Sequence, residues 1–286
     1  MTGKPSPAPG TMRILLLIAI LSGHLATASP QQLTLFSLET LPSATDGNPG
    51  ITHLSAALAV PLTFAGVRMT HGVSFKQMSK GFQTDAAPAT DDPTKLYEVR
   101  YEVTARFGLS DKWSALVYLG PGLSADARFD SPRANDFDFR SALVLQKPLK
   151  SGSLGFGASY RNRMDLAVVP IFLMDTYVSP RVHLDIAAPA RATAWYESGP
   201  RRAGLTIRYT SKTYGLPSAS GSRLDHKVLA VGAEAESRLS GPLSVRGTLG
   251  YALSNNLEYS SGSEEETIKL GSGMSFGFAL LFSAAK

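Results

Sequence analysis

The sequence predicts an all-β protein: an antiparallel up-and-down transmembrane β-barrel of about 14 strands, with 12 strands as the alternative. Three observations predict this fold. Apolar and polar residues alternate with period two, an export signal begins the chain, and the connections between the expected strands are mostly long and short in turn.

The period-two pattern is clearest in 98–107. Val99, Tyr101, Val103 and Phe107 fall on one face there, and alternate positions carry Glu, Arg and Thr. The same pattern recurs in 202–210, 243–251 and 274–283. Because successive side chains of a strand point to opposite faces, each segment has an apolar face and a polar face. In an exported chain this pattern favours a barrel with lipid outside and water inside.

The export signal is the N-terminal segment. Met12 and Arg13 precede an apolar run, 14–21, and Ala26-Thr27-Ala28 forms a small-residue cleavage site. The run is shorter than the roughly 20 residues of a membrane-spanning helix. We therefore predict a signal peptide over 1–28, cleaved after Ala28, and a barrel domain over 29–286, with translation starting at Met1 or at Met12.

Composition excludes several classes of function. The chain has no cysteine, and removal of Lys4 and Arg13 with the signal lowers the formal charge from +5 to +3. Charges of both signs are interspersed without a basic cluster, so no nucleic-acid partner is expected. There is no histidine pair at helix spacing and no phosphate-binding or dinucleotide motif, so neither a metal nor a cofactor is expected.

The expected strands are separated by Gly-, Ser-, Pro- and Asp-rich turns. Their ranges are 33–41, 53–62, 66–77, 96–108, 112–122, 136–147, 153–162, 169–178, 181–188, 191–198, 202–212, 226–239, 242–252 and 268–282. The expected long connections are 42–52, 79–95, 123–135, 213–225 and 253–267. One short connection, at Pro189, falls where a long one is expected. Long extracellular loops and short periplasmic turns are typical of outer-membrane barrels, so both chain ends are expected in the periplasm.

Two sets of side chains are candidates for function. The polar faces supply lumen-lining candidates, which either set the selectivity of a pore or pair across strands to hold the interior together. These are Glu98, Arg100, Glu102, Arg106, Asp138, Arg140, Arg161, Arg208, Glu234, Glu236 and Arg246. Aromatic residues near strand ends are candidates for the girdles at the two membrane interfaces. These are Tyr97, Trp113, Tyr160, Trp195, Tyr209, Tyr251 and Phe282.

Catalytic patterns are weak. The segment 273–277 matches G-x-S-x-G but lies within an expected strand, whereas a nucleophile elbow needs a strand, a sharp turn and a helix. Four histidines, His53, His71, His183 and His226, have no spacing that links them to a serine and an acid. We therefore expect no catalysis and assign no catalytic residue.

The stretch from Leu109 to Ser198 resembles the DUF6268 family of bacterial outer-membrane β-barrel proteins of unknown function. The resemblance rests on six segments: 112–113, 120–126, 155–160, 169–172, 184–189 and 194–196. It implies the barrel fold and the outer membrane of a Gram-negative bacterium, and it implies no catalytic residue.

Together these observations predict an outer-membrane barrel that is a passive, porin-like pore for small solutes or a structural barrel. Outer-membrane lipid and lipopolysaccharide are the expected surroundings, and the apolar final strand is expected to be recognised by the barrel-assembly machinery. Two alternatives are a lipid-modifying hydrolase with a His/Ser pair and a soluble periplasmic β protein that binds a ligand. The sequence leaves open the solute, the oligomeric state and whether the lumen is plugged.

Overall fold

The computed structural model describes residues 32–41, 50–64, 67–81, 94–125, 136–162, 167–216, 222–261 and 264–283. The predicted signal peptide and its cleavage site lie outside these residues and stay a prediction. No helix in the described ranges is long and apolar enough to cross a membrane.

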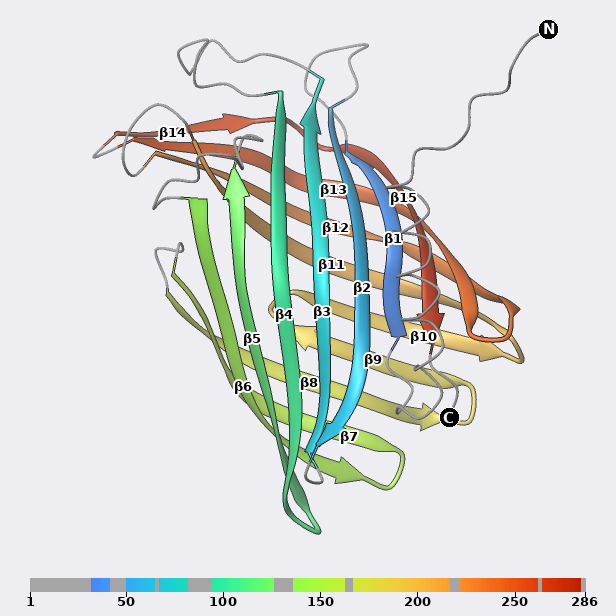
Figure 1. Cartoon of the computed structure of the whole chain (residues 1–286). Helices are drawn as coiled ribbons and strands as arrows, with labels where there is room; N and C mark the ends of the chain where they lie inside the picture. The colour runs from blue at the N-terminus through green and yellow to red at the C-terminus, as the bar shows by residue number, and fades with distance from the viewer. Residues whose placement is uncertain are drawn as a thin grey trace, which may run out of the picture.

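The described residues form one sheet of fifteen strands (Figure 1). The strands are β1 (Gln32–Leu41), β2 (Ile51–Phe64), β3 (Val67–Lys80), β4 (Lys95–Ser110), β5 (Trp113–Ala125), β6 (Phe137–Leu149), β7 (Gly152–Arg161), β8 (Val168–Ser179), β9 (Val182–Ala188), β10 (Arg191–Ser198), β11 (Arg201–Gly215), β12 (Arg223–Ser240), β13 (Leu243–Ser261), β14 (Glu264–Lys269) and β15 (Gly273–Ser283).

The sheet closes into a barrel with 14 strand positions. Consecutive strands pair antiparallel from β1 to β13, and β15 pairs with both β13 and β1. β14 and β15 lie end to end along β13, since β14 pairs with Asn256–Ser261 and β15 with Leu243–Ala252. They therefore share one position. The prediction of an antiparallel up-and-down barrel with about 14 strands is confirmed.

One predicted connection is wrong. The segment 253–267, expected as a long loop, forms the upper part of β13 and most of β14. Leu257, Tyr259 and Ile268 point into the barrel and join an apolar cluster there. Burial of these three side chains outweighs the turn signal of the surrounding Ser, Asn and Glu residues.

The two ends of the barrel differ. Six short turns, the start of β1 and the end of β15 lie at one end, here called the turn end, where Gln32 pairs with Ser283. The longer connections lie at the other end, here called the loop end. The exception predicted at Pro189 is present: β9 and β10 are separate short strands joined at Pro189-Ala190, and the Ala188-Pro189 peptide is cis.

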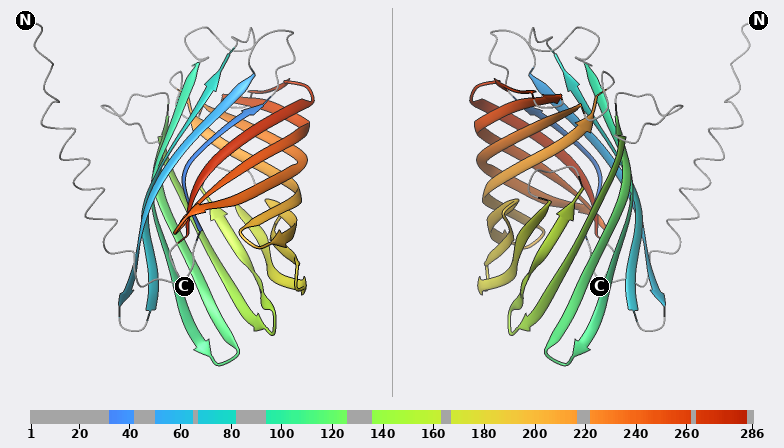
Figure 2. Two further views of the ribbon diagram at one scale, coloured as in Figure 1. Left: turned by 90° about the vertical axis from the view of Figure 1, so that its right-hand side faces the viewer. Right: turned by 90° about the vertical axis from the view of Figure 1, so that its left-hand side faces the viewer.

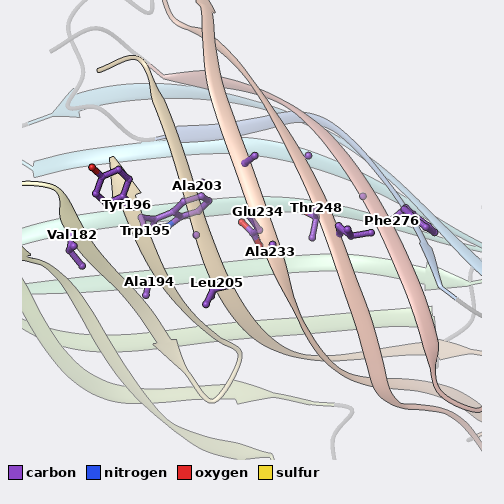
Figure 3. A pocket seen from close by; sticks show the side chains of 15 residues that line it. Val182, Ala194, Trp195, Tyr196, Ala203, Leu205, Ala233, Glu234, Thr248 and Phe276 are labelled. Atoms are coloured by element: carbon purple, nitrogen blue, oxygen red, sulfur yellow. The ribbon is translucent and has the colours of Figure 1, made fainter. Parts of the chain in front are cut away.

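An apolar belt covers the outside of the barrel. Leu205 is 72 % exposed, Phe276 58 % and Leu58 48 %, and each lies on the outer face of its strand. Over β10 to β15 the outer face also contains a hollow of about 780 Å³ between small residues such as Ala194, Ala203 and Ala233 (Figure 3). Exposed apolar surface of this extent is the lipid-facing surface of a transmembrane barrel.

The wall is not of even height. β9 and β10 have seven and eight residues, whereas β11, β12 and β13 have 15, 18 and 19. β10 pairs with β11 from Arg201 to Arg208, so that 209–215 has β12 on one side and no described strand on the other. Figure 2 shows this difference in height between the short yellow strands and the long orange ones.

The interior near the loop end is filled by an apolar cluster. It consists of Leu41, Ile51, Met78, Leu96, Tyr214, Leu216, Leu224, Val228, Ala230, Ala252, Leu257, Tyr259 and Leu270, with Ile268 packed against it. The cluster residues come from seven strands, β1 to β4 and β11 to β13, and from Leu216 and Leu270, which directly follow β11 and β14. Several of them are completely buried. The barrel therefore has a packed core at its loop end.

Candidate functional site: the closed interior

A buried ion-pair network lies below the apolar cluster, toward the turn end. The carboxylate of Glu98, on β4, accepts hydrogen bonds from Lys76 Nζ at 2.8 Å, Arg100 Nε at 3.3 Å and Arg140 Nη2 at 2.8 Å. Asp138, on β6, pairs with both Arg100 and Arg140. Glu98 and Arg100 are each 1 % exposed. Buried charges require such partners, and the network joins the inner faces of β3, β4 and β6.

Two glycines of β5 make room for Arg100. A Cβ atom at Gly122 would lie 2.8 Å from the carbonyl oxygen of Val99 and 3.3 Å from Arg100 Cζ. A Cβ atom at Gly120 would lie 3.1 Å from Arg100 Cδ, and the carbonyl oxygen of Gly120 accepts a hydrogen bond from Arg100 Nη1 at 2.6 Å. The Gly-Pro-Gly segment thus lets the guanidinium lie against the backbone of the neighbouring strand.

The part of β11 nearest the loop end, 209–215, lies close to the opposite wall of the barrel. Cα atoms of β11 come within 8 Å of those of β4 and β5. Ser124 Oγ, on β5, donates to the carbonyl oxygen of Thr213 at 3.0 Å, and Arg161 Nη1, on β7, donates to that of Ser211 at 3.3 Å. Tyr209 N donates to the carbonyl oxygen of Ala190 at the end of β10. Backbone groups of alternate residues point to the same side of an antiparallel strand, so those of 211 and 213 point to the side where β10 has ended. Side chains from β5 and β7 take the place of the absent strand.

Two histidines also connect strands of the wall that are not neighbours. His53, on β2, and His226, on β12, stack with ring centroids 5.0 Å apart, and His53 Nε2 lies 3.0 Å from His226 Nδ1. His226 Nε2 lies 2.8 Å from Asn255 Oδ1. Arg208 Nη2 donates to Glu39 Oε1 at 2.5 Å close by, between β11 and β1. These contacts close the space between the ion-pair network and the apolar cluster.

A second charged group lies near the turn end and corrects one prediction. Trp195, expected in an outer girdle, is 1 % exposed and lies on the inner face, in the same row across the wall as His183, Gly204 and Glu234. The guanidinium carbons of Arg202 and Arg246 lie 4.4 and 5.4 Å from its ring centroid. Because side chains alternate along a strand, Trp195 lies on the same face of β10 as Thr193 and Glu197, which is the inner face. Cation–π contacts with the two arginines favour this position.

The lumen-lining candidates lie on the inner face by strand register. Glu98, Arg100, Asp138 and Arg140 form the ion-pair network, and Glu236 accepts hydrogen bonds from Arg202 and Arg246, each at 2.8 Å. The other contacts are Ser74 to Glu102, Arg106 to Gln146, Arg161 to Ser211, Arg208 to Glu39, and Glu234 to Arg246 at 3.7 Å. Most of these charges thus contact partners on other strands.

The remaining girdle candidates lie on the outer face. Tyr97, Tyr160, Tyr209 and Tyr251 lie toward the loop end, and Trp113 and Phe282 toward the turn end. Trp113 makes an edge contact with the outward Phe156, with ring centroids 5.9 Å apart. Their role as membrane girdles stays a prediction.

Within the described residues, neither the G-x-S-x-G match nor the histidines have contacts that would form a catalytic site. The G-x-S-x-G match lies within β15, where Ser275 is 1 % exposed. His183 contacts Asp175 and Glu197, and His71 contacts the hydroxyl of Tyr101. No histidine of the described ranges has a serine as its hydrogen-bond partner in these contacts, and no group of three or more potential metal-ligating residues is found in the same ranges.

Sequence comparison finds one family. The family model described as "Domain of unknown function (DUF6268)" matches residues 68–285, a much longer stretch than the 109–198 that carry the resemblance in the sequence. No curated protein matches the chain.

The solved structures that are similar in fold include a secretin, a channel and a porin. A bacterial polysaccharide outer-membrane secretin has a TM-score of 0.35 at 10 % identity, over 87 % of this chain and 98 % of that one. A mutant of the TodX monoaromatic hydrocarbon channel has 0.38 at 10 %, over 92 % of each chain. A mutant porin of Rh. blastica has 0.28 at 9 %, over 89 % and 100 %. Because these scores are low, the barrel is assigned from its own strand pairing.

Proposed function

The chain belongs to the DUF6268 family, a family without an assigned function, and from the geometry of its interior we propose that it is an outer-membrane barrel closed to free diffusion at its loop end. The turn end, where β1 begins and β15 ends, faces the periplasm. The protein is thus a structural barrel in this arrangement, and any passage of solute requires movement of the side chains that fill it.

The observation that carries this proposal is the contact between β11 and the opposite wall. A barrel of 14 strands has room for an open lumen if its wall stays round. Here β11 lies within hydrogen-bond distance of β5, and the apolar cluster occupies the space on its other side. A solute entering from the loop end therefore meets packed side chains in place of water.

The charges of the interior act chiefly as internal partners in this proposal. A carboxylate such as Glu98, with three cationic donors around it, has little capacity left to attract a passing ion. Paired buried charges hold strands in register, whereas selectivity for ions depends on charges exposed to the pore. This favours the structural alternative over a passive pore.

Planar-bilayer recording tests the proposal. The full mature chain, folded as judged by heat-modifiable migration on a gel, is expected to insert without a steady stepped conductance. The double variant Ser124→Ala/Arg161→Ala removes the hydrogen bonds from Ser124 and Arg161 to the backbone of β11 and is expected to show openings.

Ser37→Ala is the matched control, because it removes a hydrogen bond to Ser55 between neighbouring strands of the wall and leaves β11 untouched. It is expected to stay closed. A steady conductance of the unmodified barrel, as large as that of an open lumen, would overturn the proposal.

A further inference from the structure

The barrel wall is lower at β9 and β10 than at the strands on either side, β8 and β11, and this difference in height is here called the step. Closure of the loop end does not explain the step. β8 pairs with β9 from Phe172 onward, so that its first residues, 168–171, extend beyond the end of β9. β11 likewise extends beyond β10 from Tyr209. Both strands therefore have an edge without a described neighbour, above the turn at Pro189-Ala190. The outward Tyr160 and Tyr209 flank this step, and their predicted role in a membrane girdle would put the step at the level of the outer membrane interface.

The inner face of β8 beside the step is apolar. Val169, Ile171 and Leu173 point inward, since they pair through β7 with the inward residues Ala142, Val144 and Gln146 of β6. Val168, Pro170 and Phe172 are apolar on the outer face as well. Lipid explains an apolar outer face, but a hydrated interior does not explain the inner one.

β7, the strand beside this apolar strip, has only small inward side chains next to it. Its inward residues opposite the strip are Ser159, Gly157 and Gly155, which pair with Val169, Ile171 and Leu173. The three inward positions of β8 remain half-buried. From Arg161 to Gly155 the strip spans six residues, or about 20 Å, the length of a long-chain acyl group.

A cation lies at the upper end of the strip. Arg161 donates one hydrogen bond, to the carbonyl oxygen of Ser211, and forms no ion pair with the described residues. Arg100, Arg140 and Arg208, by contrast, each pair with a carboxylate. A guanidinium has five N–H donors, so most of those of Arg161 remain for an anionic group.

We propose that the step is a side entrance for a single-chain anionic amphiphile such as a fatty acid, with its head group on Arg161 and its chain along Val169, Ile171 and Leu173. The amphiphile moves sideways from the outer leaflet into the part of the interior that faces the turn end. This inference rests on the proposed function, because only a barrel inserted in a membrane with its loop end closed needs such a route.

Fluorescence quenching in phospholipid vesicles tests the inference. Because the chain has no cysteine, a small fluorophore attaches at one chosen position, Ile171→Cys on the inner face or Phe172→Cys on the outer face. The probe is a fatty acid brominated near the middle of its chain, with its methyl ester as the neutral counterpart. The acid is expected to quench the label at 171 saturably and at lower concentration than the ester. Arg161→Gln is expected to abolish this preference for the acid, and Arg161→Lys to restore it in part.

The two labels separate the inference from the proposed function. Loss of fluorescence at 172 alone would overturn the side entrance and leave the membrane barrel standing. Absence of quenching at 172 would contradict the membrane barrel itself. Thr70→Cys, on the inner face of β3, is the control position; quenching there equal to that at 171 would mean that the fatty acid fills the interior without a site, which overturns the inference.

Discussion

Glu98 connects more charged partners than any other carboxylate in the ion-pair network. Its two oxygens accept from Lys76, Arg100 and Arg140, which come from three strands. Glu102, two residues further along the same face of β4, has hydroxyl partners, Ser74 and Tyr118. Comparing substitutions of the two residues therefore separates the effect of ion pairing on stability from the effect of an inward carboxylate that has only hydrogen bonds.

Glu98→Gln is expected to lower the free energy of unfolding by about 3–5 kcal/mol, because it leaves buried cations without their counter-charge. Glu102→Gln, the matched control, is expected to cost about 1 kcal/mol, the contribution of an ordinary hydrogen bond. Urea unfolding in vesicles, followed by the shift in gel migration, measures both. Equal losses in the two variants would show that the ion pairs of Glu98 do not hold the barrel together.

At the scale of the element, β11 has two parts with different neighbours. From Arg201 to Arg208 it lies between β10 and β12, as in any sheet. From 209 to 215 it depends on β12 and on side chains of β5 and β7. The second part thus joins the wall to the interior and decides whether the loop end is closed.

Ser124→Ala/Arg161→Ala is expected to speed amide hydrogen exchange in 209–215 by about thirtyfold, since the two lost hydrogen bonds contribute about 1 kcal/mol each. Exchange in 201–208 is expected to stay unchanged, because β10 still covers that part. Hydrogen-exchange mass spectrometry of the folded barrel resolves the two peptides. Faster exchange along the whole strand would mean instead that the substitutions loosen the barrel as a whole.

The sequence predicts most elements because alternation depends on neighbours along the chain. It predicts the 14 positions of the barrel, and the short strands on either side of Pro189. It misses the strands within 253–267, because the apolar positions there are few and Ser, Asn and Glu residues separate them. The inward position of Trp195 agrees with the alternation of its own strand. The prediction was wrong because it relied on the preference of aromatic residues for girdles and not on this alternation.

The closure of the interior could not be predicted from the alternation of residues along each strand, because it depends on contacts between distant parts of the chain. Ser124 and Thr213 are 89 residues apart in sequence, and His53 and His226 are 173 apart. Their contacts depend on how far the wall flattens, which follows from the unequal lengths of strands on its two sides. The sequence does contain one sign of the unequal strand lengths. The turns on either side of Pro189 are closely spaced, so the two strands between them must be short.

In the whole molecule, the two faces of the barrel wall differ in polarity, and the outer face is the one that suits hydrocarbon. Leu205 is 72 % exposed on the outer face, whereas Arg100 is 1 % exposed within the barrel. A soluble protein with this surface would expose its most apolar side chains to water at a large cost in free energy. The expectation of a soluble periplasmic protein is therefore disfavoured by the arrangement of the two faces.

The two tryptophans test this arrangement most directly, because Trp113 lies on the outer face and Trp195 within the barrel. Trp195→Phe leaves Trp113 as the only tryptophan, and Trp113→Phe leaves Trp195. In vesicles of phospholipid brominated at a shallow position of the acyl chain, we expect strong quenching of Trp113 and little quenching of Trp195. Quenching of Trp195 as strong as that of Trp113, or of neither, in variants with the gel migration of the folded barrel, would contradict this expectation.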